Sequence, residues 1–171
     1  MFGCFVTEAK RLQEKYKDKI CLLVGLETEY IRKSELSDIQ KLRDQYSLDY
    51  VVGSVHHVDG IPTDFSYELY EKAEETLGGT EKIFCKYFDQ QYDLMTEVKP
   101  EVIGHFDLIW LYRHKFIATD IILEKIERNI DYAISYGAIF EINTAGASLR
   151  KKLGHPYPQR WILKVCTDHE I

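Results

Sequence analysis

Carboxylate, imidazole and amide side chains follow four apolar stretches of this sequence, at the point where each stretch ends. In chain order they are Glu27 and Glu29, His56 and His57, His105 and Asp107, and Glu141 and Asn143. Residues two apart on a strand share a face, so His105 and Asp107 can point into one pocket, and so can the last pair. A lone pair such as His56 and His57 would usually be two partly exposed imidazoles in a turn. Four polar endings in succession favour a functional site.

The mixture of glutamate and histidine indicates which chemistry such a site would perform. Zn, Mn and Fe accept imidazole together with carboxylate ligands, whereas Mg and Ca prefer oxygen ligands alone. A Ser-His-Asp hydrolase of the α/β type would need a G-x-S-x-G elbow, which is absent, as are the G-x-x-x-x-G-K-[ST] and G-x-G-x-x-G loops. The simplest interpretation is a metal site at the mouth of a parallel barrel.

The elements that must position these residues can be predicted from periodicity. Continuous apolar runs, typical of strands covered on both faces, predict strands at 20–27, 50–55, 101–106 and 138–142. Apolar residues at helical spacing predict helices at 4–17, 34–46, 67–78, 81–98 and 119–136. Their alternation predicts βαβ units and one parallel sheet, at whose carboxyl edge α/β folds build their sites. The long connection 56–100 is expected to hold two helices joined at Gly-Gly-Thr 78–80.

Composition and charge exclude several classes of protein. The 171 residues, 45% hydrophobic and 29% charged, suffice for one globular domain, which we take to span 1–171. A net charge of −6 argues against non-specific nucleic-acid binding. No apolar run approaches the roughly 18 residues of a membrane span, and we see no secretory signal. The 4 scattered cysteines suit reduced thiols, so we expect a cytoplasmic protein. From the charge and the lack of a long apolar run, we expect it to bind neither nucleic acid nor membrane.

Four segments together resemble a known family in order and spacing. They are GLETEYI (25–31), VVGSVHHVDGIPTDF (51–65), VIGHFDLI (102–109) and FEINTAGASLRKKLGHPYP (140–158). They are similar to the histidinol-phosphatase branch of the polymerase and histidinol phosphatase (PHP) superfamily, across nearly the whole chain. The resemblance implies a seven-stranded (β/α) TIM-like barrel with a trinuclear metal centre. It also implies hydrolysis of a small phosphorylated substrate, L-histidinol phosphate, in histidine biosynthesis.

The resemblance also implies roles for individual residues. Glu27 would be the carboxylate that bridges two metals, and His56 and His105 would complete the protein ligands of one metal. The implied cofactors are divalent Zn, Mn or Fe ions, up to three in full-length relatives. His57 receives no ligand role and is expected behind the ligands or at the rim of the pocket. Asp107 is expected to orient the His105 side chain without itself binding the metal.

A phosphate clamp is expected in the Arg-Lys-Lys run. Arg150 is the best candidate, because a guanidinium fork matches two phosphate oxygens, and Lys151 and Lys152 are alternatives. Asn143 is counted with them as a candidate substrate-binding residue. A solvated loop explains the same run of charges equally well.

The chain departs from the family pattern at both ends. The family has an H-x-H strand and a second histidine-ending strand before the GLE segment, and an Asp-x-His on its last strand. Here Thr167-Asp168-His169 follows the helical stretch at 161–166 and lacks that spacing, so it is expected to be helical. We therefore expect about four parallel strands of the seven. An open arc leaves two sheet edges unpaired and predicts self-association.

Three interpretations of function compete at this stage. The first is a histidinol-type phosphatase, supported by the matched segments. The second is a catalytically impaired fragment or a non-catalytic remnant that keeps a partial metal site or only binds a partner. The third, a nuclease-like member of the superfamily, is disfavoured by the acidic charge. Counting ligands predicts at most one tightly bound metal, since Glu27, His56 and His105 suffice for one open site.

Overall fold

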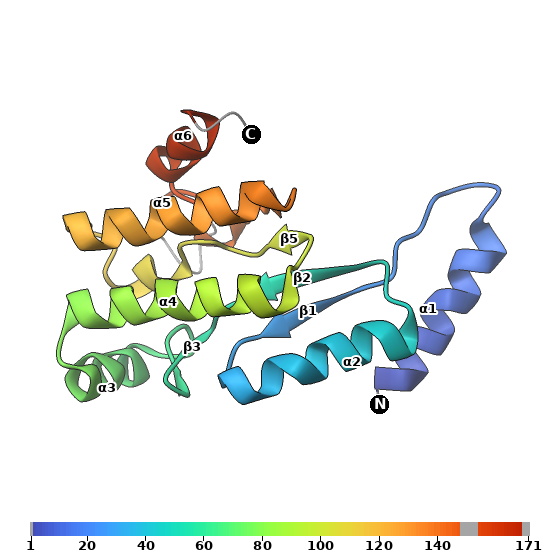
Figure 1. The fold of residues 1–171 in the computed structure, drawn as a ribbon, viewed down its shortest axis with the longest axis horizontal. Coiled ribbons are helices and arrows are strands. Elements are labelled where there is room, and N and C mark those ends of the chain that lie inside the picture. Colours follow the sequence, from blue (N-terminus) through green and yellow to red (C-terminus); the bar gives the residue numbers. More distant parts are fainter. Residues whose placement is uncertain (1, 148–153, 169–171) are drawn as a thin grey trace.

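A four-stranded parallel sheet forms the centre of the fold in the computed structural model, which describes residues 2–147 and 154–168 (Figure 1). Its strands, in spatial order, are β1 (Gly25–Glu29), β2 (Tyr50–Ser54), β5 (Val102–Ile103) and β6 (Ile139–Phe140). All three neighbouring pairs are parallel. The predicted α/β class and the predicted set of four parallel strands are confirmed.

The predicted helices are all present. They are α1 (Phe2–Tyr16), α2 (Leu36–Tyr46), α3 (Tyr67–Leu77), α4 (Thr80–Val98) and α5 (Asp120–Ser135), with α6 (Arg160–Asp168) near the end of the described chain. Short 3-10 turns lie at η1 (Lys33–Glu35), η2 (Leu108–Tyr112) and η3 (Thr144–Ala147). The joint between α3 and α4 is at Gly78, whose φ of 87° lets it end α3 in the left-handed conformation. No helix in the described ranges is both long and apolar enough to cross a membrane.

Several details of the strands differ from the sequence prediction. β5 and β6 are shorter than the expected 101–106 and 138–142, and β1 ends at Glu29 rather than at residue 27. The first strand begins at Gly25 rather than at residue 20. Just before it, the Val24 N–H donates a hydrogen bond to the Asp49 side chain at 2.7 Å and not to a neighbouring strand. A hairpin of β3 (His57–Val58) and β4 (Ile61–Pro62) was not predicted. Its two-residue loop is Asp59-Gly60, with φ values of 50° and 78°. Asp-Gly is a strong signal for such a turn, so this hairpin was readable from the sequence.

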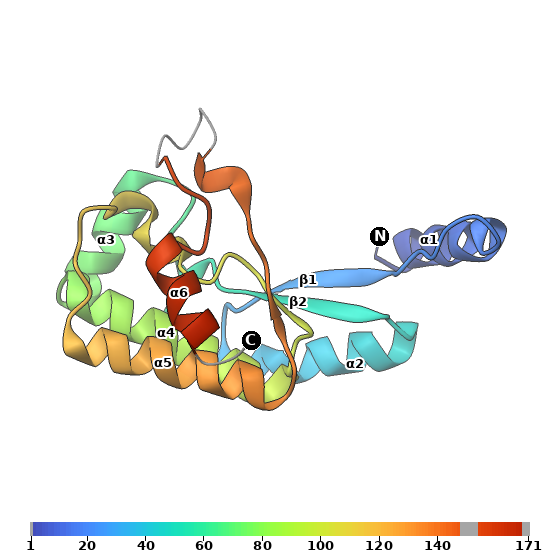
Figure 2. The same ribbon diagram turned by 90° about the horizontal axis from the view of Figure 1, so that it is seen from above.

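One face of the sheet is covered by α2, α4 and α5, which lie side by side in both views (Figures 1 and 2). Between α4 and the segment after β5, aromatic rings pack edge to face, with Phe84 and Trp110 centroids 4.5 Å apart. Buried Asn129 donates to the Phe88 carbonyl at 2.8 Å and to Gln91 at 3.1 Å, which ties α5 to α4. Gln91 in turn donates to the Phe106 carbonyl at 3.0 Å. The backbone next to His105 is therefore held by the helical layer.

The first helix stands apart from this core. α1 lies beyond the end of the sheet, beside the C-terminal end of α2, where the rings of Phe2 and Tyr46 have centroids 5.2 Å apart (Figure 1). It packs on a small separate cluster of Val6, Val24 and Leu48. The Asp49 carboxylate joins the parts of this corner, because Oδ2 also accepts a hydrogen bond from Gln13 at 2.9 Å. One carboxylate thus joins α1, the chain before β1 and the chain before β2 at this corner.

Replacing Asp49 with alanine should therefore release α1 locally. The buried Val24 N–H would lose its acceptor, which costs about 1–3 kcal/mol. Hydrogen exchange measured by mass spectrometry should show faster exchange in peptides from α1 and from 20–24, with little change in α4. Asp38→Ala, which removes only an exposed ion pair to Lys41, is the matched control and should change little. Equal protection of α1 in both variants would contradict this role of Asp49.

Candidate metal centre

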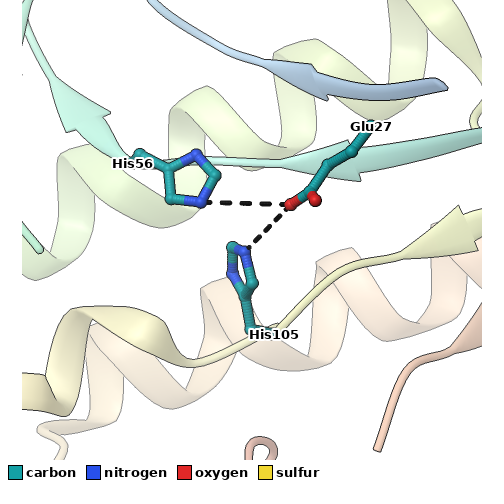
Figure 3. A group of neighbouring side chains, drawn as sticks. All are labelled: Glu27, His56 and His105. Carbon is teal, nitrogen blue, oxygen red and sulfur yellow. Dashed lines mark ion pairs between the residues drawn. The ribbon is translucent and has the colours of Figure 1, made fainter. Parts of the chain in front are cut away.

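Glu27, His56 and His105 converge at the carboxyl edge of the sheet (Figure 3). Glu27 lies in β1, His56 follows β2 and His105 follows β5, and one donor atom from each lies within 4.8 Å of the others. Oε1 of Glu27 is 3.4 Å from His105 Nε2 and 4.0 Å from His56 Nε2. The sequence prediction that these three side chains meet is confirmed. Their role as ligands remains a proposal.

The spacing of the three donors fits a single divalent ion. Donors bound tetrahedrally at zinc distances of about 2.0–2.2 Å lie roughly 3.3 Å apart. The Glu27 to His105 separation of 3.4 Å is close to that value, and the Glu27 to His56 separation of 4.0 Å is somewhat longer. One carboxylate with two imidazoles suits Zn, Mn or Fe. The residues therefore fit an ion with open positions left for water and substrate.

Two of the three side chains, Glu27 and His56, have pKa values shifted in the direction that suits metal binding. His105, and to a smaller extent Ser54, lower the pKa of Glu27 to about 2, against the opposing effect of burial. Burial first, and the neighbouring His105 second, lower the pKa of His56 below its usual value. A ligating carboxylate must be ionised and a ligating imidazole neutral. Protons therefore compete only weakly with a metal ion for Glu27 and His56 at neutral pH.

A close approach of two strands holds Glu27 in place. The buried Ser54 hydroxyl, at the end of β2, donates to Oε1 of Glu27 at 2.7 Å. A Cβ at Gly104 would lie 2.4 Å from that hydroxyl oxygen and 3.1 Å from Val52 Cγ1. Glycine at 104 is therefore needed for the contact between Ser54 and Glu27.

Glu141 supports His105 through its backbone. His105 has a φ of 23°, which is uncommon for a residue with a side chain, and it is only 7% exposed. Its backbone N–H donates to Glu141 Oε2 at 2.9 Å, and Asn143 Nδ2 donates to the other oxygen of Glu141 at 3.1 Å. The last polar pair of the sequence thus lies together, as expected, and stabilises the turn that carries His105. The substrate-binding role of Asn143 stays a prediction.

Asp107 is the residue expected to orient His105. It is fully buried, and burial raises its pKa to about 6. Among the described residues, Oδ2 of its carboxylate accepts a hydrogen bond from the backbone N–H of Gln159 at 2.9 Å. This contact attaches the start of α6 to the segment after β5. An orienting role of Asp107 toward His105 stays a prediction that these contacts do not support.

A second carboxylate contacts the histidine pair. Oε1 of Glu29 lies 2.8 Å from His57 Nδ1 and 3.7 Å from His56 Nδ1. His56 thus presents Nε2 to Glu27 and its other ring nitrogen to Glu29. A carboxylate beside the far nitrogen of a ligating imidazole orients the ring and raises its basicity. His57 lies beside the ligands, at the rim, as the sequence predicted.

An open cavity of about 430 Å³ lies over this edge of the sheet. Its walls include Glu27, Glu29, His56, His57, Asp64 and Phe65. Asp64 and Phe65 were not singled out from the sequence, although the Asp-Gly turn signal would have placed them just after a hairpin beside His56. The predicted clamp residues Arg150, Lys151 and Lys152 lie outside the described residues.

Comparisons with known proteins agree with this geometry. A family model described as PHP domain matches residues 2–145. A protein of Schizosaccharomyces pombe named "Probable histidinol-phosphatase" is 47% identical over 173 residues, covering 98% of this chain and 56% of that protein. The "Histidinol-phosphatase" of Saccharomyces cerevisiae is 29% identical, and the match covers 98% of this chain and 59% of that protein. The chain thus spans less than two thirds of the length of these relatives.

The fold also has a counterpart among solved structures. A crystal structure from Listeria monocytogenes, of a candidate histidinol phosphatase, matches with a TM-score of 0.82. The match covers 99% of this chain and 68% of that one, at 20% identity. At this identity the likeness shows the fold, in which four parallel strands belong to a TIM-like barrel.

The contact between Ser54 and Glu27 can be tested through Gly104. Gly104→Ala should push the Ser54 hydroxyl away from Glu27 and weaken Zn²⁺ affinity by about tenfold, as loss of support behind a ligand typically does. Ser54→Ala should have a similar effect. In the double variant Gly104→Ala/Ser54→Ala, the loss of Zn²⁺ affinity should be smaller than the product of the two single-variant losses. The methyl group added at residue 104 then has no hydroxyl oxygen at residue 54 to displace.

Titration calorimetry with Zn²⁺ measures these affinities, and thermal unfolding shows whether each variant folds. Ser135→Ala removes an exposed hydroxyl on α5 that bonds only to the Tyr132 carbonyl, and it serves as the control. Independent, fully multiplicative losses in the double variant would show that Gly104 and Ser54 do not act on the same contact.

Proposed function

The chain belongs to the PHP domain family, and from that premise we propose that it takes part in metal-dependent hydrolysis of phosphate monoesters, with L-histidinol phosphate as the substrate. The observation that carries this proposal is the convergence of Glu27, His56 and His105 on one divalent-ion position. The names of the two yeast relatives support the substrate and its place in histidine biosynthesis. Because those relatives are nearly twice as long, the activity and substrate of the whole protein are proposals for this chain.

Each residue of the site would have its own role in binding the metal ion or the phosphate. Glu27 and the two histidines would hold the ion, with Glu27 kept ionised beside Ser54 and His105. A divalent ion supplies Lewis-acid chemistry, polarising phosphoryl oxygens and lowering the pKa of bound water. Glu29 would keep His56 oriented toward the ion. Arg150, Lys152 and Asn143 remain the proposed contacts to the phosphate oxygens, where a guanidinium fork would pair with two of them.

The number and kind of metal ions belong to the same proposal. Within the described residues, three donors form one group, so we expect at most one tightly held ion from these ligands. The three-metal cluster implied by the family resemblance would need further ligands. The donor set favours Zn, Mn or Fe over Mg or Ca. The whole of 1–171 would act as one partial barrel domain, which the family match over 2–145 supports.

A cytoplasmic location is likewise proposed. The four cysteines are free: Cys4 and Cys21 are exposed, Cys85 is partly buried and Cys166 is buried. Free thiols are typical of reducing compartments. Fractionation of cells that express the chain would test this location, and recovery in a secreted or membrane fraction would contradict it.

Self-association would follow from the edges of the sheet. Within the described sheet, β1 and β6 each have a neighbour on one side only. Ile139 in β6 is 62% exposed, and Ile142 just beyond it is 63% exposed. Unpaired edges with exposed apolar residues are templates for pairing with another chain. A second copy of this chain is the partner we propose for the β6 edge.

Sedimentation velocity should then show concentration-dependent association of the purified chain. Ile139→Lys should shift the population toward monomer, because a charge on an edge strand opposes edge-to-edge pairing. Ile121→Lys is the control, since Ile121 is exposed on α5 and not on a strand. A monomer at all concentrations, with cooperative unfolding, would contradict association through the β6 edge.

The activity itself can be tested with the purified chain. Phosphate release from L-histidinol phosphate in the presence of Mn²⁺ should be measurable but far slower than that of a full-length relative, because ligands for further ions are missing from the described site. His105→Ala should reduce both metal content and turnover, the latter by about tenfold or more. His114→Ala is the matched control, because His114 is exposed outside the site. A single-stranded DNA substrate should not be cleaved.

Three outcomes would contradict parts of the proposal. Metal binding without any phosphate release would favour the non-catalytic interpretation, in which a partial metal site is kept. Turnover that survives His105→Ala unchanged would show that other residues complete the site. Rapid turnover of L-histidinol phosphate by the chain alone would overturn the expected limit of one metal.

A further inference from the structure

A second hollow lies along α6, which is on the far side of α5 from α4 (Figure 1). Its volume is about 740 Å³, against about 430 Å³ for the cavity over the metal ligands, and no described residue lines both. Volumes of roughly 300–1,000 Å³ are usual for small-molecule sites. The walls of this α6 hollow include His155, Gln159, Arg160, Trp161, Leu163 and Lys164.

The helical repeat explains the chemistry of this hollow. Arg160, Leu163 and Lys164 are three and four residues apart, so they share one face of α6. Ile162 and Cys166 lie on the other face and are buried in the core. Arg160 and Lys164 are exposed, and Leu163 is half-buried. The outer face of α6 therefore combines an apolar side chain with two cationic ones.

The charge of the α6 hollow differs from that of the other cavities in this acidic chain. Three carboxylates line the cavity over the metal ligands, and three more line a hollow on α4 and α5, namely Glu124, Glu127 and Asp131. The described wall of the α6 hollow has no carboxylate. Its two cations, Arg160 and Lys164, form no ion pair within the described residues. A chain of net charge −6 thus has one hollow whose field attracts an anion.

The apolar part of the wall is already in place without a ligand. The Trp161 ring packs edge to face on Trp110, with centroids 6.0 Å apart, and its indole N–H donates to Gln159 Oε1 at 3.3 Å. The Gln159 backbone N–H donates to Asp107 at 2.9 Å. Trp161 also lines a smaller apolar hollow of about 330 Å³, whose wall includes Ile117, 84% exposed. A preorganised apolar surface that remains in water is typical of a binding site.

We propose that the α6 hollow is a binding site for a small organic anion with an apolar body, such as an aliphatic or aromatic carboxylate. The apolar body lies against Trp161 and Leu163, and the anionic group pairs with Arg160 and Lys164. The size of the hollow favours a small molecule over the broad surface of another protein. Because both cations are exposed, they give selectivity for an anion more than affinity. The site uses none of the metal ligands and goes beyond the proposed phosphatase function.

Three probes with one chain length separate charge from apolar burial. Octanoate, 1-octanol and octylammonium differ only in the head group. The chain has 2 tryptophans, and Trp110 is only 2% exposed, so tryptophan fluorescence during a titration reports mainly on Trp161. Octanoate should bind about tenfold more tightly than octylammonium, because the two cations attract one head group and repel the other. The neutral alcohol should have an intermediate affinity.

Substitutions in the hollow should change these affinities selectively. Arg160→Gln and Lys164→Gln should each weaken octanoate by about threefold to fivefold and leave 1-octanol unchanged. Leu163→Asp should abolish octanoate binding, and thermal unfolding shows whether this variant folds. Lys41→Gln is the matched control, because Lys41 is exposed on α2 and pairs with Asp38. Octanoate affinity should stay unchanged in Lys41→Gln.

Equal affinities of octanoate and octylammonium for the unmodified chain would overturn the inference. A loss of octanoate binding in His105→Ala would also overturn it, because His105 does not line the α6 hollow. Sedimentation velocity tests whether a second copy of the chain occupies the hollow instead. Association that Leu163→Asp abolishes and octanoate does not disturb would identify such an interface and overturn the small-molecule site. Phosphate release from L-histidinol phosphate tests the proposed function separately, so failure of one leaves the other unaffected.

Discussion

The parallel pairing of β1 with β2 and of β2 with β5 is the constraint on which the candidate site depends. It sets Glu27 opposite Val52, and it brings the chain ends that carry His56 and His105 to the same edge. Because side chains alternate along a strand, a slip of one residue would turn Glu27 to the other face of the sheet. The hairpin after β2 and the turn after β5 then direct the two imidazoles back toward that carboxylate. Three side chains from distant parts of the sequence meet for this reason.

The ligands are held by contacts that differ in kind. Glu27 is held by a hydroxyl that can approach because Gly104 has no side chain. His105 is held through its backbone, by a carboxylate that is itself bonded to Asn143. His56 has Glu29 beside its second ring nitrogen and Thr63 on its carbonyl. These supports come from all four strands or their loops, so the geometry of the donors reflects the whole sheet and not one local motif.

The electrostatics of the cavity follow from the same arrangement. Three carboxylates and two histidines line one opening, which is unfavourable unless cations or protons compensate the charge. A divalent ion beside Glu27 and His56 would compensate part of this charge. Metal binding at this edge of the sheet would thus follow from the charge distribution of the cavity.

The sequence by itself determined the elements, their order and the three residues most suited to bind metal. Helical periodicity and continuous apolar runs are local properties, so the helices and the four parallel strands were predicted correctly, and the matched segments identified Glu27, His56 and His105. The limits of β1, β5 and β6 were wrong, and at the start of β1 a long-range partner, Asp49, accepts the hydrogen bond of the Val24 N–H.

Only the tertiary structure decided which groups support the ligands and which face the cavity. Asp107 is two residues from His105, yet its hydrogen bonding is to Gln159, 52 residues away along the chain. The contact of Ser54 with Glu27, and the close approach of Gly104 to Ser54, depend on distances between segments far apart in sequence. Spacing along a chain specifies which face a side chain occupies. Which residues a side chain contacts on that face depends on tertiary packing, and a local sequence pattern does not determine it.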